Sequence, residues 1–229
     1  MSTDPPAGSA DAQEHQPGDS ESPPASSTPQ LTRLSSQFGQ FTYRLSKTKT
    51  VTFKGVRVYY RLFLSGTPIY SVKLKSDRLG PQTPISHGFD IHLSQTSFEG
   101  FLISDEAHKN FSLRLSSPYG KELMTIATDN TDATRPCAIT VRFFAQRDIL
   151  PPIMKNRQPI RTPDGQFTLD FDGKYAIPSV KNCVIVNECN RPYIIFRRIS
   201  KTDYEIDAFT RIYPLCLVGF ALAVIYSPK

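Results

Sequence analysis

The sequence contains few cysteines, and their spacing suggests no metal site or redox pair. Cys137, Cys183, Cys189 and Cys216 are the four cysteines in 229 residues, without a Cys-x-x-Cys motif. The N-terminus lacks the charged and then apolar pattern of a secretory signal, and Ser2 replaces the glycine that myristoylation requires. We therefore expect a cytosolic protein whose cysteines are reduced, small residues of the core.

The sequence also lacks an apolar run long enough for a membrane-spanning helix, which needs about 20 apolar residues. The longest uncharged apolar segment is 212–226, and its helical part from Pro214 covers thirteen positions. That length corresponds to about 20 Å of helix. Apolar residues on every face, after a proline at the start, are typical of a helix that is buried on all sides. We expect a central core helix; an unusually short membrane anchor at the C-terminus is the alternative.

Residues 1–30 contain no aromatic residue, no lysine and no arginine. Such a composition cannot offset the entropy lost on ordering, so we predict a disordered, acidic, Pro- and Ser-rich tail over residues 1–38. The tail has five acidic residues, which leaves 27 basic and 16 acidic residues from position 31 onward. The predicted domain, residues 39–229, is therefore markedly basic, which favours an anionic partner or an ordinary lysine-rich surface.

Short runs of alternating apolar and polar residues begin near Phe41 and are typical of strands with one wet face. The clearest run places Val56, Val58, Tyr60, Leu62 and Leu64 on one face. Turn-forming pairs such as Asp164-Gly165 and Asp172-Gly173 separate the runs. The predicted strands are 41–45, 50–54, 56–64, 69–75, 89–94, 98–103, 111–115, 122–128, 138–144, 166–172, 182–187, 193–199 and 204–208. Residues 147–155 are expected to form at most a turn or two of helix.

A sheet of this many strands tends to close, because closure removes its exposed edges. A barrel of about twelve strands is too wide for its own side chains to fill. The C-terminal helix is the natural occupant of the interior. The predicted fold class is mainly β: a closed antiparallel barrel of about twelve strands with a central hydrophobic α-helix.

The C-terminal third of the sequence contains a series of short segments in a characteristic order: Asn156-Arg-Gln-Pro-Ile160, Phe167–Gly173, Ser179-Val-Lys-Asn182, Ala208-Phe-Thr210, Tyr213-Pro-Leu-Cys216 and Phe220–Ala223. These segments resemble those of the Tubby C-terminal domain family. They keep the family's order and spacing over about 70 residues. Weaker matches upstream are Phe98–Gly100, Phe111–Leu113 and Arg135–Val141. The sequence departs from the family at Arg161, where a Trp is usual, and it contains no Trp at all. It resembles a compact, divergent member.

The resemblance implies a module that binds phosphoinositide headgroups, such as the 4,5-bisphosphate, through basic side chains on the barrel wall. A Lys-x-Arg pair of the family corresponds here to Lys73 and Lys75, and Arg78 and Lys109 are further candidates. Strand alternation directs Lys73 and Lys75 outward, about 6.5–7 Å apart. An ordinary solvated strand face is the alternative for this pair. Lys47, Lys49, Lys54, Arg57 and Arg61 form a second basic stretch that would widen the patch.

Other chemistry has little support in the sequence. It has no His-Glu-x-x-His or nucleophile-elbow motif, so we expect no enzyme, no catalytic residue and no cofactor. Asp170-x-Asp172-Gly173 resembles the start of a calcium loop, but the twelfth position is Lys181 rather than Glu, so we interpret it as a turn and expect no metal. Nucleic-acid binding, with stacking on Tyr59, Tyr60 and Phe63, ranks well below lipid.

The predicted role follows from the resemblance. It implies a monomeric adaptor that contacts the cytoplasmic face of the plasma or ciliary membrane peripherally and carries membrane-protein cargo. A nuclear location also fits the family. The competing hypothesis is a soluble protein-interaction or transcription-related barrel that does not bind lipid, since the fold alone does not fix the function.

Overall fold

The structure is a computed structural model that describes residues 39–53, 55–130, 137–209 and 211–228. The predicted tail, residues 1–38, lies outside the described residues. The strands of the described part are β1 (Gln40–Thr52), β2 (Gly55–Leu64), β3 (Thr67–Leu74), β4 (Gln82–His87), β5 (Gly100–Ser104), β6 (Asn110–Leu115), β7 (Glu122–Asp129), β8 (Ala138–Phe143), β9 (Ile153–Asn156), β10 (Ile160–Arg161), β11 (Phe167–Thr168), β12 (Cys183–Val186), β13 (Pro192–Arg198) and β14 (Asp203–Phe209). One helix, α1 (Pro214–Tyr226), follows them.

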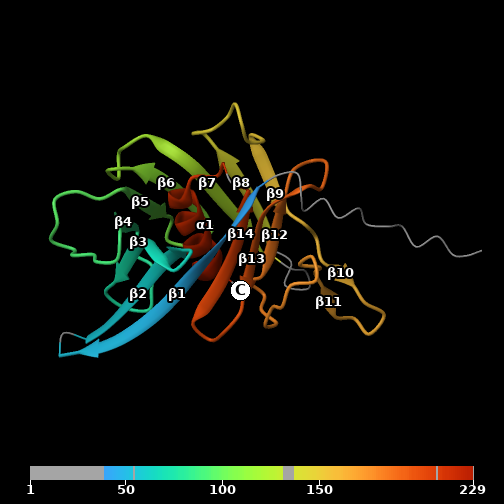
Figure 1. Cartoon of the computed structure of the whole chain (residues 1–229), viewed down its shortest axis with the longest axis horizontal. Helices are drawn as coiled ribbons and strands as arrows, with labels where there is room; N and C mark the ends of the chain where they lie inside the picture. Colours follow the sequence, from blue (N-terminus) through green and yellow to red (C-terminus); the bar gives the residue numbers. More distant parts are fainter. Residues whose placement is uncertain (1–38, 54, 131–136, 210, 229) are drawn as a thin grey trace, which may run out of the picture. The chain divides into compact units, whose positions relative to one another are not determined.

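Twelve of these strands form a closed barrel in the order β1-β14-β13-β12-β9-β8-β7-β6-β5-β4-β3-β2 (Figure 1). Neighbouring strands are antiparallel, and the pairing of β1 with β14 closes the ring, with Tyr43 opposite Ile206. The alternation predicted for β2 is present, since Val58, Tyr60 and Leu62 are fully buried. The predicted fold class is therefore confirmed.

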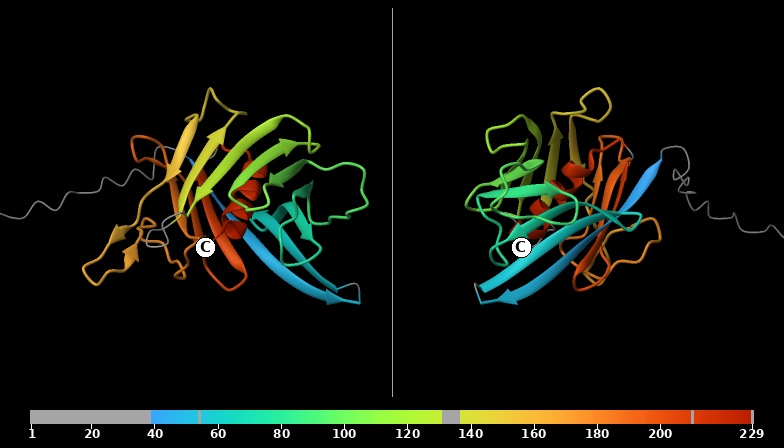
Figure 2. Two further views of the ribbon diagram at one scale, coloured as in Figure 1. Left: turned by 180° about the vertical axis from the view of Figure 1, so that it is seen from behind. Right: turned by 60° about the vertical axis from the view of Figure 1, so that its left-hand side comes forward.

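Helix α1 runs inside the barrel and is surrounded by its strands (Figures 1 and 2). All ten residues from Leu215 to Val224 are buried, which agrees with an apolar surface on every face. Burial of each large side chain contributes about 1.5–3 kcal/mol, so the helix supplies a substantial part of the core's stability. No helix in the described part of the chain has both the length and the hydropathy for a membrane crossing. The segment is a core helix, as predicted, and the anchor alternative is wrong.

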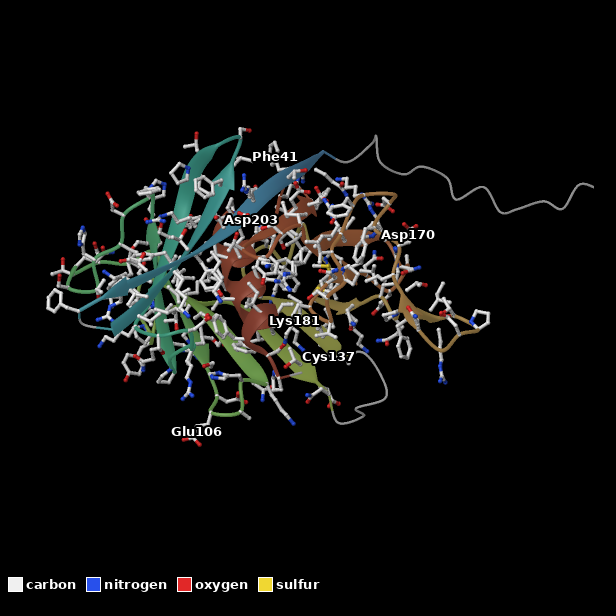
Figure 3. The ribbon with its side chains drawn as sticks, turned by 90° about the horizontal axis from the view of Figure 1, so that it is seen from below. Phe41, Glu106, Cys137, Asp170, Lys181 and Asp203 are labelled. Carbon is white, nitrogen blue, oxygen red and sulfur yellow. The ribbon has the colours of Figure 1, made fainter. Side chains whose placement is uncertain are left out.

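The C-terminal end of α1 is held by polar contacts at one end of the barrel. The Lys181 ammonium donates to the Ser227 carbonyl oxygen at 2.6 Å and to the Ser227 hydroxyl at 3.0 Å. Figure 3 shows Lys181 beside this end of the helix. A positive charge here complements the helix dipole. The Tyr226 hydroxyl donates to Asp77 at 3.1 Å, so the connection between β3 and β4 lies at the same end.

The segment between β9 and β12 covers the outside of the barrel wall. Leu169 and Phe171 pack on the outward side chains of Val184, Val186 and Ile195, which are buried although they face away from α1. The wall at β12 and β13 is therefore apolar on both faces. For that reason, the sequences of β12 and β13 contain continuous apolar runs.

Several predicted elements differ from the structure. Residues 41–45 and 50–52 belong to one long strand, β1, which ends at Thr52, and the predicted strand 89–94 is a loop, whereas β4 lies just before it. Strand β9 occupies the end of the segment for which a turn or two of helix was predicted. The predicted strand 166–172 is reduced to Phe167–Thr168, which pairs with Ile160–Arg161 outside the barrel.

The cysteines also differ in part from the prediction. All four are free. Cys183 and Cys216 are buried and Cys137 is half-buried, but Cys189 is exposed in the connection between β12 and β13. The prediction of core cysteines is therefore wrong for Cys189. It lies in a turn rather than in a strand, so it does not belong to a face that is directed into the core.

Candidate functional site

The outward faces of β2 and β3 carry a group of basic side chains around one tyrosine. We call Arg57, Tyr59, Arg61, Lys73 and Lys75 the basic wall. Because β2 alternates, its buried residues point to α1 and Arg57, Tyr59 and Arg61 point outward. Tyr59 lies opposite Lys73 in the ladder, and Arg61 lies opposite Ser71. The two strands thus bring Arg57, Arg61 and Lys73 onto one surface, and Lys75 follows directly after the end of β3 at Leu74.

Tyr59 is the centre of the basic wall. The Lys73 ammonium lies 5.4 Å from the centroid of its ring, and the Arg61 guanidinium lies 5.1 Å from it. Each distance is within the range of a cation–π interaction, about 6 Å. The ring therefore holds two positive charges beside each other, which would otherwise repel.

A loop fixes the position of Arg61. The Arg61 guanidinium lies 3.9 Å from the ring centroid of Phe89, and its Nε donates to the Phe89 carbonyl oxygen at 3.2 Å. The buried hydroxyl of Ser71 ties the same loop to β3, since it lies 2.6 Å from the Gly88 carbonyl oxygen and 2.8 Å from that of Phe89. Arg61 is therefore a preorganised cation, with its remaining donors open to solvent or to an anion.

Arg57 and Lys75 extend the basic wall toward the end of the barrel where α1 ends. The Arg57 Nη1 donates to the Lys75 carbonyl oxygen at 3.0 Å, which places the two residues side by side. Lys75 is exposed and Lys73 half-buried. No described carboxylate forms an ion pair with any of the four cations. Their charge is therefore available to an external anion.

The four predicted site residues do not all come together. Lys73 and Lys75 share the basic wall, and Arg78 is exposed a few residues further on, in the connection between β3 and β4. Lys109 lies in the turn between β5 and β6, and two strands separate β6 from β3. This turn neighbours the connection that holds Arg78, because the Ser104 amide donates to the Pro81 carbonyl oxygen at 3.0 Å.

The predicted second basic stretch divides between two faces. Arg57 and Arg61 belong to the basic wall, whereas Lys47 faces the barrel end and forms an ion pair with Asp77 at 2.8 Å. Lys49 lies on the same face of β1 as Lys47, and Lys54 lies outside the described residues. Burial alone would raise the pKa of Asp77, but the hydrogen bonds and charge of Lys47 and the Tyr226 hydroxyl keep it below the ordinary value.

Sequence reasoning missed Tyr59 and Phe89 as the supports of these cations. The alternation Arg57-x-Tyr59-x-Arg61 carries a signal, since it places the three side chains on one face of β2. No comparable signal marks Phe89, because its contact with Arg61 depends on how the loop after β4 folds back.

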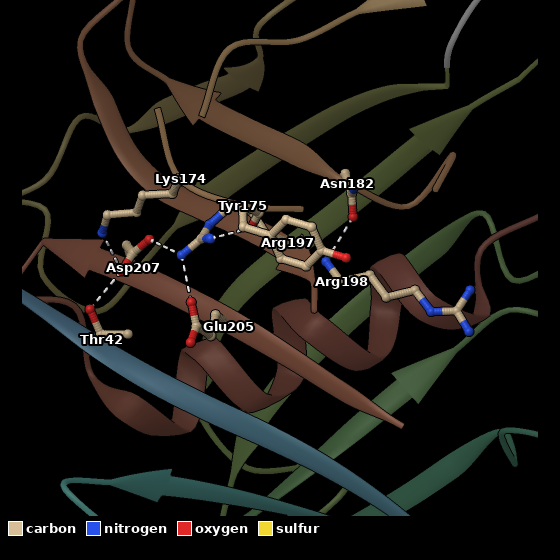
Figure 4. A network of polar contacts seen from close by, with 8 residues as sticks. All are labelled: Thr42, Lys174, Tyr175, Asn182, Arg197, Arg198, Glu205 and Asp207. Carbon is tan, nitrogen blue, oxygen red and sulfur yellow. Dashed lines mark hydrogen bonds and ion pairs between the residues drawn. The ribbon is translucent and has the colours of Figure 1, made fainter. Parts of the chain in front are cut away.

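A second charged cluster lies on the outside of β13 and β14 and is shown in Figure 4. The nearly buried guanidinium of Arg197 contacts Asp207 at 2.9 Å and Glu205 at 2.7 Å, and it donates to the Tyr175 carbonyl oxygen at 2.6 Å. Lys174 binds the other oxygen of Asp207 at 2.9 Å. Because each charge has a partner from the covering segment or the wall, this cluster fastens that segment to the barrel.

Two shallow grooves lie elsewhere on the barrel. One, of ≈ 430 Å³, adjoins the start of α1 near Tyr70 and Pro214, and the other, of ≈ 690 Å³, crosses β5 to β8 near Thr125. Each has a single basic side chain among its described lining residues, Lys121 and Arg142 respectively. Within the described ranges, no cluster of His, Cys, Asp and Glu has the arrangement of a metal site.

The fold and this surface define a class: a closed antiparallel β-barrel that encloses its own C-terminal helix and carries a basic outer wall. No protein-family model matches the sequence, and no curated protein matches it. A protein of Arabidopsis thaliana, known from an X-ray structure, is similar in structure at 10% sequence identity with a TM-score of 0.43. The similarity covers 81% of this chain and 90% of that one.

Proposed function

We propose that the protein is a non-catalytic, Tubby-type adaptor that binds phosphoinositide headgroups and docks reversibly on the cytoplasmic face of a membrane. The observation that carries the proposal is the basic wall. It presents Lys73 and Lys75 together with Arg57 and Arg61 on one surface, and no described carboxylate neutralises them.

The spacing of the cations suits a headgroup with two phosphates. Lys73 lies in β3 and Lys75 directly follows this strand. In an extended chain, the Cα atoms of residues two positions apart are separated by about 6.5–7 Å. Each ammonium acts as a point charge on a flexible stem, and the Arg57 guanidinium beside Lys75 adds donors suited to phosphate oxygens. Lys73 and Lys75 are the primary contacts in this proposal, and Arg78 and Lys109 are peripheral ones.

Residues of the Tubby-like signature have definite positions that support the family part of the proposal. The Asn156 side chain accepts from the Ile139 amide at 2.8 Å and donates to the Cys137 carbonyl oxygen at 3.0 Å. Asn182 accepts from the Arg198 amide at 2.8 Å, and its neighbour Lys181 holds the end of α1. The two asparagines fasten neighbouring segments of the barrel to each other, and Lys181 fastens the barrel to the end of the helix.

Flotation of the protein with liposomes tests the proposal. We expect the protein to float with vesicles of phosphatidylcholine that contain phosphatidylinositol 4,5-bisphosphate, and not with phosphatidylcholine alone. Lys73→Ala/Lys75→Ala should lose most of this binding. The control is Lys121→Ala/Lys155→Ala, which removes the same charge from two exposed positions away from the basic wall.

The outcomes separate the possible errors. If the wild-type protein floats no better than Lys73→Ala/Lys75→Ala, the lipid site lies elsewhere. If the wild type does not float at all, the lipid proposal fails, and a soluble protein-interaction role takes its place. Strong binding of single-stranded nucleic acid in moderate salt would favour the transcription-related alternative, although Tyr60 is buried and only Tyr59 and Phe63 remain for stacking.

The wider role is part of the same proposal. The barrel domain, residues 39–229, would act as a monomer that brings membrane-protein cargo to the plasma or ciliary membrane. Pull-down of membrane proteins by the wild type, compared with Lys73→Ala/Lys75→Ala, would show whether cargo binding depends on the lipid site.

A further inference from the structure

The hairpin of β1 and β2 extends past the rest of the barrel. Strand β14 pairs with β1 only as far as Ser46, and β3 pairs with β2 only from Val58 onward. The ladder between β1 and β2 nevertheless continues to the pair Thr52–Gly55. Figures 1 and 2 show the hairpin projecting beyond the neighbouring strands. Near its tip, the hairpin is therefore held together by the pairing of β1 with β2.

The tip of this hairpin carries two exposed apolar side chains, Val51 and Phe53. Phe53 is 95% exposed and Val51 is 77% exposed, among the highest values for large apolar residues in the described chain. Val51 continues the face that carries Tyr43 and Leu45 in the core, but beyond the barrel it has no core to contact. Moving an exposed aromatic side chain from water into an apolar environment lowers the free energy of the system.

The same hairpin carries the edge of the basic wall. Arg57 lies opposite Thr50 on the outer face, and its guanidinium reaches the Lys75 carbonyl oxygen at 3.0 Å. Lys49 is exposed on the opposite face of β1. An apolar tip flanked by cations has the composition of a segment that enters the interface of an anionic membrane.

We propose that the tip of the β1–β2 hairpin, Val51 and Phe53, inserts into the lipid interface while the basic wall holds anionic headgroups. This inference rests on the proposed function and adds an apolar contact to it. The cations determine which membrane is chosen, and the tip lengthens the time for which the protein stays bound. A free soluble inositol phosphate would engage only the basic wall, whereas a membrane engages both.

The absence of tryptophan makes a direct test feasible. Phe53→Trp introduces the only tryptophan of the chain at a position where a larger ring meets no core. With vesicles of phosphatidylcholine and phosphatidylinositol 4,5-bisphosphate, we expect its emission to shift to the blue and to be quenched by lipids labelled near the headgroup. The matched control is Tyr119→Trp, because Tyr119 is 89% exposed in the turn between β6 and β7, at the other end of the barrel. Its emission should not change.

A second pair of variants separates the two contributions. Val51→Ser/Phe53→Ser should weaken vesicle binding by about a hundredfold, since two apolar contacts are lost and each is worth about one tenfold step. This loss should vary little with salt and should leave binding of soluble inositol phosphate unchanged. Lys73→Ala/Lys75→Ala should instead reduce binding of both ligands and reduce the salt dependence.

The outcomes distinguish this inference from the proposed function. If flotation shows that Phe53→Trp is bound to vesicles while its emission is unshifted and unquenched, the insertion is wrong and headgroup binding stands. If neither the wild type nor Phe53→Trp floats with the phosphoinositide vesicles, both proposals are overturned. Equal shifts for Phe53→Trp and Tyr119→Trp would indicate non-specific adsorption and would also overturn the insertion.

Discussion

Gly219 of α1 lies directly against Leu113 of β6. A Cβ atom at position 219 would be 3.1 Å from the Cδ1 atom of Leu113 and 3.2 Å from its Cδ2 atom. The helix approaches this strand so closely that a methyl group at residue 219 would require the Leu113 side chain to shift by a few tenths of an ångström. The contact favours a glycine at this position in the middle of a helix, where glycine costs about 1 kcal/mol relative to alanine.

The first prediction concerns this contact. Gly219→Asp should abolish soluble expression, because it places an unpaired carboxylate in the core. Gly219→Ala should fold, with the gain in helix propensity set against an overpacking cost of about 1–3 kcal/mol. Solubility and the midpoint of thermal unfolding measure both effects. A soluble, cooperatively folded Gly219→Asp variant would show that the helix does not require this approach.

The second prediction concerns the fastening of the covering segment. Asp207→Asn should lower the free energy of unfolding by about 1.5–3 kcal/mol, since it removes one of the two carboxylates that pair with the buried guanidinium of Arg197 and leaves Glu205 as its remaining anionic partner. The exposed substitution Asp148→Asn is the control and should have almost no effect. Urea unfolding followed by circular dichroism measures the difference. A change below 1 kcal/mol for Asp207→Asn would contradict the role of the cluster.

The third prediction is the pH dependence that this carboxylate confers. Burial would raise the pKa of Asp207, but Thr42, Lys174 and Arg197 together hold it below the ordinary value. A carboxylate whose pKa is lower in the folded state stabilises the protein above the unfolded-state pKa of about 3.9. That stability is lost as the pH falls through the folded-state pKa. The acid limb of the stability curve should therefore be flatter in Asp207→Asn; parallel limbs would argue against it.

The fourth prediction concerns two hydroxyl groups at the end of α1. The Tyr60 and Tyr226 hydroxyl oxygens are 3.1 Å apart, and Tyr226 also donates to Asp77. Tyr226→Phe should cost about 1–2 kcal/mol because it leaves the Tyr60 hydroxyl without a partner. The cost should be smaller in a Tyr60→Phe background, where that hydroxyl is absent. A double-mutant cycle measures this coupling, and strict additivity would exclude it.

The fifth prediction concerns thiol reactivity. Cys189 is exposed, whereas burial raises the pKa of Cys216 to about 12 and also raises the pKa of Cys183. At pH 8, iodoacetamide should label Cys189 in the native protein and label Cys183 and Cys216 only after unfolding. Mass spectrometry of peptides measures the rates. Native labelling of Cys216 as fast as that of Cys189 would mean that the barrel opens readily.

The sequence predicts the barrel and its helix because both depend on local patterns. Val58, Tyr60 and Leu62 alternate with polar residues, and the helix has no polar face, so burial on one side and on all sides can be inferred without tertiary information. Strand β4 could not be predicted in this way, because Pro84 lies in its middle and proline is unusual in a strand. The apolar residues Phe89 and Ile91 just after it alternate as they would in a strand, although they belong to a loop.

The covering segment marks a second limit. Phe167, Leu169 and Phe171 alternate like a strand of the barrel, but Leu169 and Phe171 pack on the outside of the wall. A period of two cannot distinguish the inner surface of a barrel from an outer surface that another segment covers. The site shows the same limit, because the outward direction of Lys73 follows from alternation, whereas the support of Arg61 by Phe89 depends on a loop contact.

The closing pair of the barrel, β1 and β14, has a consequence for synthesis in the cell. Thr42 and Asp207, which are hydrogen bonded across that pair, are 165 residues apart in the chain. At about 5–20 residues per second, the ribosome needs on the order of 10 to 30 s to make the intervening chain. During that time the inner faces of the early strands have neither their last neighbour nor the helix. We expect folding to be largely post-translational and slow, in keeping with the high contact order, and to rely on chaperones that shield the open sheet.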